Sequence, residues 1–310
     1  MRLTVGMVRR FTWAWQGRPV EAVYEVVGTG APVLLLPAFS TVSSREEMRP
    51  LALHLAAAGF ACTLVDWPGF GSSTRGRLGY GPALYEGFLA DFCTAVTPAG
   101  TAVIAAGHAS GYALALGQRR PGLWRRIVLL APTWRGPLPT AMGPRPRAYA
   151  IMRTLVRAPV IGQALYRLNI HPRVIGMMYR RHVYADADQV TPAFIATKRG
   201  FARGPGARFA SVAFVTGALD PSPDRQGFQA LLGPPPATTL ILCGTATPPK
   251  SKAEMAAIAQ SSSVTVQWVP GSLGLHEESV GIIGRLIATF LADQARVEQP
   301  GSAAPRRLIG

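Results

Sequence analysis

Short apolar runs alternate with segments of helical pattern over the first part of the chain. The runs predict strands at residues 32–36, 61–67, 102–106 and 127–130. Such continuous runs are typical of strands covered on both faces, as in a parallel sheet. The intervening segments predict helices at residues 44–59, 84–95 and 110–119. Residues 21–28 alternate between apolar and polar side chains, which predicts a half-exposed edge strand. The pattern therefore predicts βαβ units around a mostly parallel sheet.

The alternation stops after the strand at residues 127–130. Residues 135–208 contain helical patterns interrupted by prolines, among them Pro144, Pro146, Pro159, Pro172 and Pro192. Strand patterns resume at residues 238–243 and 264–269, and a helix is predicted at 280–295. We therefore expect an α/β core in two parts, residues 1–134 and 236–296, with a helical cap inserted at 135–235. Residues 297–310 are predicted to be a disordered tail.

The composition supports one large, ordered domain. Of the 310 residues 48% are hydrophobic and only 15% are charged, which suits a buried core rather than disorder. Each of the three cysteines lies inside an apolar run, without a Cys-x-x-Cys pair or metal-like spacing. They predict buried thiols in a reducing compartment. We find no signal-peptide core and no spanning-length apolar run, which predicts a cytoplasmic protein. No motif predicts a metal or another cofactor.

Positive charge is concentrated in the predicted cap. The formal net charge is +16. Residues 135–208 contain 13 Lys and Arg against two Asp, a local net charge of +11. Residues 147–157 interleave basic and apolar side chains at helical spacing, which fits either an anionic membrane surface or a solvated cap face. No nucleic-acid-binding module accompanies the charge, so nucleic acid is not expected as a partner.

The segment around residue 109 has a strand, a glycine-flanked turn and a helix in succession. Its sequence is Gly107-His108-Ala109-Ser110-Gly111. It resembles the nucleophile elbow of the α/β-hydrolase fold, Gly-x-Ser-x-Gly. In that frame Ala109 occupies the position of the nucleophile, where a methyl group cannot attack a carbonyl carbon. Residues 66–73 resemble the family's Asp-x-x-Gly-x-Gly-x-Ser loop, and residues 271–278 resemble the segment that carries the catalytic histidine, especially in dehalogenase- and epoxide-hydrolase-like members.

The resemblance leaves two of three triad positions without a suitable side chain. It assigns the histidine to His276, whereas Thr247 stands where the acid is expected. The alternative acid position offers Thr133. Asp220, near the end of the insertion, could reach the pocket, but no motif places it there. We expect His276 to act as a general base. We interpret His108 as a packing residue.

The resemblance also implies a binding site around the elbow. The backbone N–H groups of Phe39 and Ser110 are the expected oxyanion donors, because they do not depend on the side chain. Ser40 lies in the same loop as Phe39. Trp134 and Arg135 follow a strand at the carboxyl edge of the sheet, where ligands bind in this fold class.

Three functions remain open from the sequence. The first is an enzyme without a covalent acyl intermediate, with His276 acting on a small lipophilic substrate. The second is a non-catalytic descendant that binds an apolar ligand or a protein. The third is an esterase-like hydrolase that uses Ser110 as its nucleophile, although the side chain next to the elbow apex points away in the family.

Overall fold

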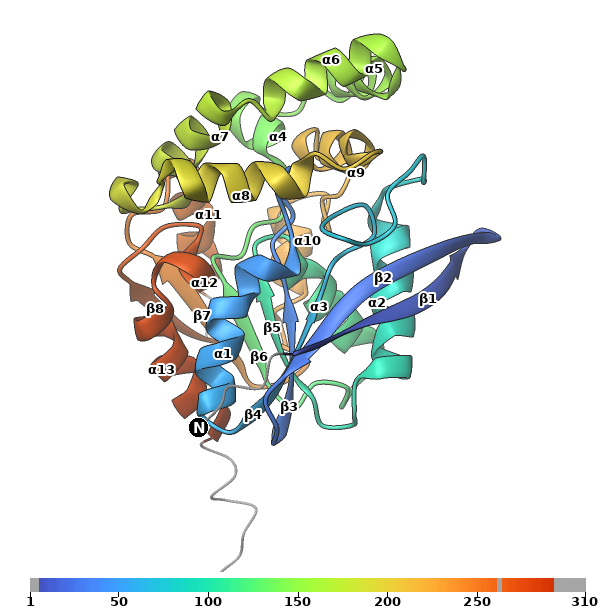
Figure 1. Cartoon of the computed structure of the whole chain (residues 1–310). Helices are drawn as coiled ribbons and strands as arrows, with labels where there is room; N and C mark the ends of the chain where they lie inside the picture. The colour runs from blue at the N-terminus through green and yellow to red at the C-terminus, as the bar shows by residue number, and fades with distance from the viewer. Residues whose placement is uncertain (1–5, 261–263, 293–310) are drawn as a thin grey trace, which may run out of the picture.

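The computed structural model describes residues 6–260 and 264–292 of the chain (Figure 1). Eight strands form one sheet in the order β1-β2-β4-β3-β5-β6-β7-β8. The strands are β1 (Met7–Trp15), β2 (Arg18–Val27), β3 (Ala31–Leu36), β4 (Phe60–Val65), β5 (Ala102–Ala106), β6 (Ile127–Leu130), β7 (Thr239–Gly244) and β8 (Thr265–Val269). The strands from β4 to β8 in this order pair in parallel. Strand β2 pairs antiparallel with both β1 and β4. The predicted α/β-hydrolase fold, a mostly parallel sheet, is confirmed.

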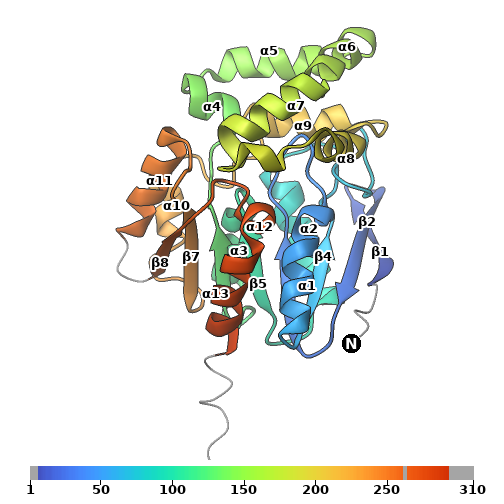
Figure 2. The ribbon, with the colours of Figure 1, turned by 60° about the vertical axis from the view of Figure 1, so that its left-hand side comes forward.

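Helices cover both faces of this sheet. The core helices are α1 (Arg49–Ala57), α2 (Pro82–Val96), α3 (Ala109–Arg119), α10 (Arg225–Ala230), α11 (Pro249–Ala259), α12 (Leu275–Glu278) and α13 (Val280–Ala292), and a 3₁₀ turn at Arg45–Met48 precedes α1. Helices α1 and α13 pack together on one face, and α2 and α3 pack together on the other (Figure 2). Strands β5, β6 and β7 are entirely buried between them, which is why their sequences are continuous apolar runs.

The insertion between β6 and β7 forms a helical layer above the carboxyl ends of the strands (Figure 1). Its helices are α4 (Pro137–Met142), α5 (Pro146–Arg157), α6 (Val160–Asn169), α7 (Pro172–Met178), α8 (Pro192–Ala202) and α9 (Ala207–Val215). Proline occupies the first turn of α4, α5, α7 and α8, a position whose N–H has no partner within the helix. Of the prolines that interrupt the sequence pattern, Pro146, Pro172 and Pro192 therefore start helices, whereas Pro144 and Pro159 lie between helices. Tyr166, Tyr179 and Tyr184 belong to a small separate core of this layer.

Three details differ from the sequence-based expectations. Strand β2 is not an edge, since it pairs with β1 on one side and β4 on the other. The edge is β1, which the sequence pattern did not reveal because most of its side chains are exposed. Helix α10 falls within the predicted cap but packs on the core, where Arg225 pairs with Glu254 of α11. The predicted tail at 297–310 lies outside the described residues.

In the described ranges 6–260 and 264–292, no helix has the length and apolar character needed to cross a membrane. All three cysteines are buried and free of disulfides, as the sequence predicts.

Candidate active site

The turn between β5 and α3 places its left-handed residue at Gly107. The backbone of Gly107 has φ +53°, whereas His108 is right-handed and α3 begins at Ala109. The sequence frame placed Ala109 at this apex, but Ala109 is a fully buried helical residue. The physical reason is that only glycine adopts positive φ without steric cost. Neither position supplies a nucleophilic side chain, because one carries a hydrogen and the other a methyl group.

The structure does not support the two roles predicted for Ser110. Its N–H donates to the carbonyl oxygen of Gly107 at 3.2 Å, so this amide is engaged within the turn and is not an oxyanion donor. Its hydroxyl is buried and donates to the carbonyl oxygen of Ala105 at 3.2 Å. Ser110 therefore faces back onto β5.

Next to the apex, three polar side chains from distant parts of the chain form a hydrogen-bonded series. His108 Nδ1 lies 2.8 Å from Thr133 Oγ1, and His108 Nε2 lies 3.2 Å from Asp220 Oδ1. An ionised Asp220 only accepts hydrogen bonds, so Nε2 carries the proton and Nδ1 accepts the hydroxyl proton of Thr133. A hydroxyl, a basic nitrogen and an orienting carboxylate thus lie in the order that nucleophilic catalysis requires.

The backbone around this series determines its geometry. The N–H of Thr133 donates to Gly107 at 3.3 Å, which ties the end of β6 to the elbow. The N–H of Gly136 donates to Asp220 Oδ1 at 2.8 Å and holds the carboxylate in place. His108 is buried edge-on against Phe214 of the cap, with ring centroids 5.1 Å apart. Thr133 itself is half-buried.

The hydroxyl of Thr133 lies beside the place that an elbow side chain would occupy. A Cβ atom built on Gly107 would lie 3.5 Å from Thr133 Oγ1 and 3.3 Å from the Cβ of Ala38. The apex glycine, the end of β6 and the loop after β3 therefore converge. The missing side chain at Gly107 leaves the nearest hydroxyl, that of Thr133, next to the elbow.

The loop after β3 contains the second predicted oxyanion donor. The N–H of Ala38 donates to Glu47 at 2.7 Å, whereas Phe39 stacks on Trp67 with ring centroids 4.9 Å apart. Among the described residues, the backbone N–H groups of Phe39 and His108 have no acceptor. Ser40 is half-buried, and its hydroxyl accepts from Val42 at 3.2 Å.

His276 occupies a buried position next to the loop after β3. Its Nε2 lies 3.3 Å from Glu47 Oε1. Its Nδ1 and the hydroxyl of Thr247 are both buried without a hydrogen-bond partner among the described residues. The acid and histidine positions of the family are thus present, but no hydrogen bond joins them. His276 has one free ring nitrogen and one carboxylate partner, which is compatible with a proton acceptor.

A buried ion pair attaches the cap above His276. Lys198 of α8 lies 2.5 Å from Glu277 of α12, and the Tyr184 hydroxyl contacts the same carboxylate at 3.3 Å. Burial acts to lower the pKa of Lys198, but the carboxylates of Glu277 and Glu47 outweigh it, so the pKa lies above its ordinary value. This pair joins cap and core and leaves no charge unpaired.

The remaining predicted residues lie in different surroundings. Trp134 is buried and stacks on Phe228 of α10, with centroids 5.0 Å apart, so it packs within the core and does not line an open pocket. Arg135 is exposed. Asp66 is buried and pairs with Arg45 at 2.5 Å, and it also accepts from the N–H of Ser72 at 2.8 Å, so it holds the loop that follows β4.

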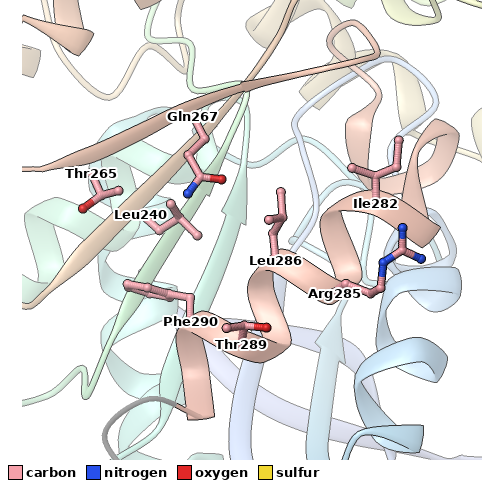
Figure 3. A pocket seen from close by; sticks show the side chains of 8 residues that line it. All are labelled: Leu240, Thr265, Gln267, Ile282, Arg285, Leu286, Thr289 and Phe290. Atoms are coloured by element: carbon pink, nitrogen blue, oxygen red, sulfur yellow. The ribbon is translucent and has the colours of Figure 1, made fainter.

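An open groove lies elsewhere on the molecule. It is lined by residues of β7, β8 and α13, among them Gln267, Arg285 and Phe290 (Figure 3). These residues lie along the sheet, away from the strand ends that hold Gly107 and Thr133. The groove is separate from the series of polar side chains at the elbow.

The sequence profile of the Alpha/beta hydrolase family matches residues 33–278. The chain belongs to the α/β-hydrolase family. The match spans β3 to α12 and therefore includes the elbow, the cap and the His276 segment. A search of curated proteins finds no match.

Solved structures with the same fold have several different activities. A bromoperoxidase from Bacillus anthracis has a TM-score of 0.71 at 17% identity, with 92% of this chain and 100% of that chain covered. A thermophilic esterase from Thermogutta terrifontis has 0.68 at 19% identity, covering 92% and 98%. The haloalkane dehalogenase DatA from Agrobacterium tumefaciens C58 has a TM-score of 0.66 at 16% identity, covering 92% and 97%. At these identities the likeness concerns the α/β-hydrolase fold alone.

Sequence reasoning missed the grouping of His108, Thr133 and Asp220. His108 was interpreted as a packing residue, and the other two were considered only as substitutes for the acid. The signal in the sequence was the coincidence of a histidine at the elbow with hydroxyl and carboxylate residues at the ends of β6 and the insertion. Only their distances reveal the series.

Proposed function

We propose that this member of the α/β-hydrolase family hydrolyses esters of small lipophilic molecules with a displaced catalytic set. Thr133 is the nucleophile, His108 the general base and Asp220 the residue that orients the base. The observation that carries the proposal is the pair of distances at His108, 2.8 Å to the Thr133 hydroxyl and 3.2 Å to the Asp220 carboxylate. Hydroxyl and base within hydrogen-bond reach, with a third group behind the base, are the signature of an activated nucleophile.

The reaction follows the usual two stages of acyl transfer. Thr133 Oγ1 forms a bond to the ester carbonyl carbon while its proton passes to His108 Nδ1. The bond to the leaving alkoxide then breaks, and the alkoxide takes the proton from Nδ1. In the second stage, water gives a proton to Nδ1 and its oxygen attacks the acyl carbon, which releases the acid and returns the proton to Thr133.

The elbow supplies electrostatic support for the oxyanion that forms. With the apex at Gly107, the residue after the apex is His108, and its N–H has no acceptor within the described part of the chain. The N–H of Phe39 is equally without an acceptor. These two amides replace the predicted pair, because the N–H of Ser110 is already engaged. Phe214 against His108 provides an apolar wall, which favours an apolar substrate.

The proposal is tested by labelling with a fluorophosphonate and by hydrolysis of short- and medium-chain p-nitrophenyl esters. We expect the label on Thr133. Thr133→Ala should abolish labelling and lower kcat by about a thousandfold or more, whereas Thr133→Ser should retain both. Ser110→Ala is the matched control and should hydrolyse like the wild type. Labelling at Ser110, or esterase activity that survives Thr133→Ala, would exclude the proposed nucleophile.

A second candidate is non-covalent proton-transfer chemistry with His276 as base. The free, buried Nδ1 of His276 favours it, as does the Glu47 carboxylate at Nε2. In that case no fluorophosphonate label appears, and turnover is lost in His276→Ala but not in Thr133→Ala. If a lipophilic ligand binds equally to the wild type and both variants without turnover, the protein is a binding descendant of the fold.

A further inference from the structure

The outer surface of the cap exposes large aliphatic side chains at helical spacing. We call this surface the outer face; its apolar residues on α5 and α6 are Ile151, Leu155, Val160, Ile161, Leu165 and Leu168. Val160 is 81% exposed, Leu168 66% and Ile151 61%. Helices α5 and α6 lie at the top of the molecule, on the side of the cap that faces away from the core (Figures 1 and 2). Contiguous exposed apolar residues of this size mark an interaction surface.

Each of these helices buries only one large side chain. Tyr149 is the only buried residue of α5, and its hydroxyl donates to the carbonyl oxygen of Gly143. Tyr166 does the same in α6, where its hydroxyl donates to Ala202 at 3.0 Å. A helix that packs with its aliphatic stripe inward would expose polar residues instead. Here the aliphatic stripe points to solvent.

The charge around the outer face is uniformly positive. No Asp or Glu occurs between residues 135 and 185. The same stretch of the chain carries exposed arginines at Arg145, Arg147, Arg157, Arg167 and Arg173, of which Arg157 also lies over the ring of Phe209. Arginine can extend its charged head to the phosphate region of a bilayer while its stem covers apolar surface. Exposed aliphatic side chains together with arginines are the composition of a helix that lies in a membrane interface.

The same charge argues against the outer face as a contact between two copies. In a two-fold dimer the same patch faces itself, which would bring these arginines against one another without a carboxylate between them. Because unpaired like charges at an interface are unfavourable, an anionic bilayer is the better occupant.

We propose that the outer face docks the protein on anionic phospholipid membranes, with α5 and α6 lying in the interface. This inference rests on the exposed side chains of the cap and is independent of the catalytic set proposed above. Aliphatic residues of α5 and α6 enter the boundary between headgroups and acyl chains. The exposed arginines of this stretch bind lipid phosphates.

The test measures partitioning of the full chain onto vesicles by flotation. Vesicles of phosphatidylglycerol mixed with phosphatidylcholine are compared with vesicles of phosphatidylcholine alone. We expect binding to the anionic vesicles that weakens as salt is raised. Arg147→Gln with Arg167→Gln should weaken it about five- to thirtyfold. Ile161→Asp with Leu168→Asp should weaken it at least about tenfold.

Matched controls lie on the exposed edge strand β1. Val8→Asp with Arg9→Gln makes comparable changes at exposed positions and should bind vesicles like the wild type. Equal binding to neutral and anionic vesicles, or unchanged binding of the outer-face variants, overturns the proposal. The proposal is also overturned if the protein binds neither kind of vesicle and sedimentation shows that the wild type is a dimer. If Ile161→Asp with Leu168→Asp then converts the dimer to a monomer, the outer face is an interface between two copies of the chain. Ester hydrolysis in solution by Thr133 does not enter any of these readouts.

Discussion

Replacement of Asp220 separates its structural contribution from its chemical one. Oδ1 of Asp220 accepts from the N–H of Gly136 at 2.8 Å and lies 3.2 Å from His108 Nε2. Asp220→Ala removes the acceptor from both donors, which are buried. Asp220→Asn keeps an acceptor oxygen for the Gly136 N–H but removes the negative charge.

The expected size of each effect follows from these contacts. A buried donor left without an acceptor costs about 1–3 kcal/mol. The Asp220 side chain is 17% exposed, so water relieves part of the loss, and we expect about 2–3 kcal/mol in total for Asp220→Ala. For a chain of this size this corresponds to a fall of roughly 3–5 °C in Tm. Asp220→Asn should cost less than about 1 kcal/mol.

The effect of Asp220→Asn on catalysis should be large although its effect on stability is small. Without the carboxylate, the imidazolium that forms at His108 loses its stabilising charge, and the preferred tautomer is no longer enforced. We expect Asp220→Asn to lower kcat for ester hydrolysis by about 10³–10⁴-fold while its denaturation curve stays near that of the wild type.

The measurements are chemical denaturation and steady-state kinetics on the same preparations. Asp188→Asn is the matched control, because Asp188 is an exposed cap residue and its substitution should change neither quantity. Asp220→Asn with activity within threefold of the wild type would refute the orienting role of Asp220. Asp220→Ala with wild-type stability would refute the hydrogen bonds themselves.

Three further predictions concern the core, the elbow and the cap. Lys198→Met should destabilise the protein by about 3 kcal/mol in denaturation at pH 7, because the Glu277 carboxylate stays buried without its cation, and adding Glu277→Gln should recover part of the loss. The folded-state pKa of Lys198 lies above its unfolded value. The stabilisation is therefore present at neutral pH and should be lost as the pH rises through that folded pKa. If the free energies of unfolding of the wild type and the double variant depended on pH in the same way, this reasoning would be contradicted. Gly107→Ala should lower the free energy of unfolding by about 1 kcal/mol more than Gly17→Ala does. Both glycines have positive φ, but only at Gly107 does a new Cβ meet Ala38, at 3.3 Å. Equal denaturation midpoints of the two variants would contradict this close approach. Burial raises the pKa of all three thiols to about 12, so a thiol reagent at pH 8 should react with none in the native protein and with three after unfolding, and a rapidly labelled native thiol would contradict the packing.

The α/β-hydrolase fold could be predicted because its signals are local. Strands β5 and β6 have the predicted bounds, since a strand covered on both faces must be apolar at every position. Edge strand β1 was missed because only its second half faces the core, through Phe11, Trp13 and Trp15, so it has no continuous apolar run. Helix α11 was missed for a related reason: Met255 and Ile258 are its only buried residues, so its sequence has almost no apolar periodicity.

The amino-acid sequence by itself determined the fold and the place of the elbow, between β5 and α3. Only the tertiary structure decided which residue forms the apex, because a five-residue motif with two glycines allows more than one frame. It also decided which polar side chains meet there. Thr133 and Asp220 are 25 and 112 residues from His108 along the chain, and no local pattern records such a contact. Strand order and the path of the insertion bring them to one edge of the sheet, where distance and burial give these side chains their chemistry.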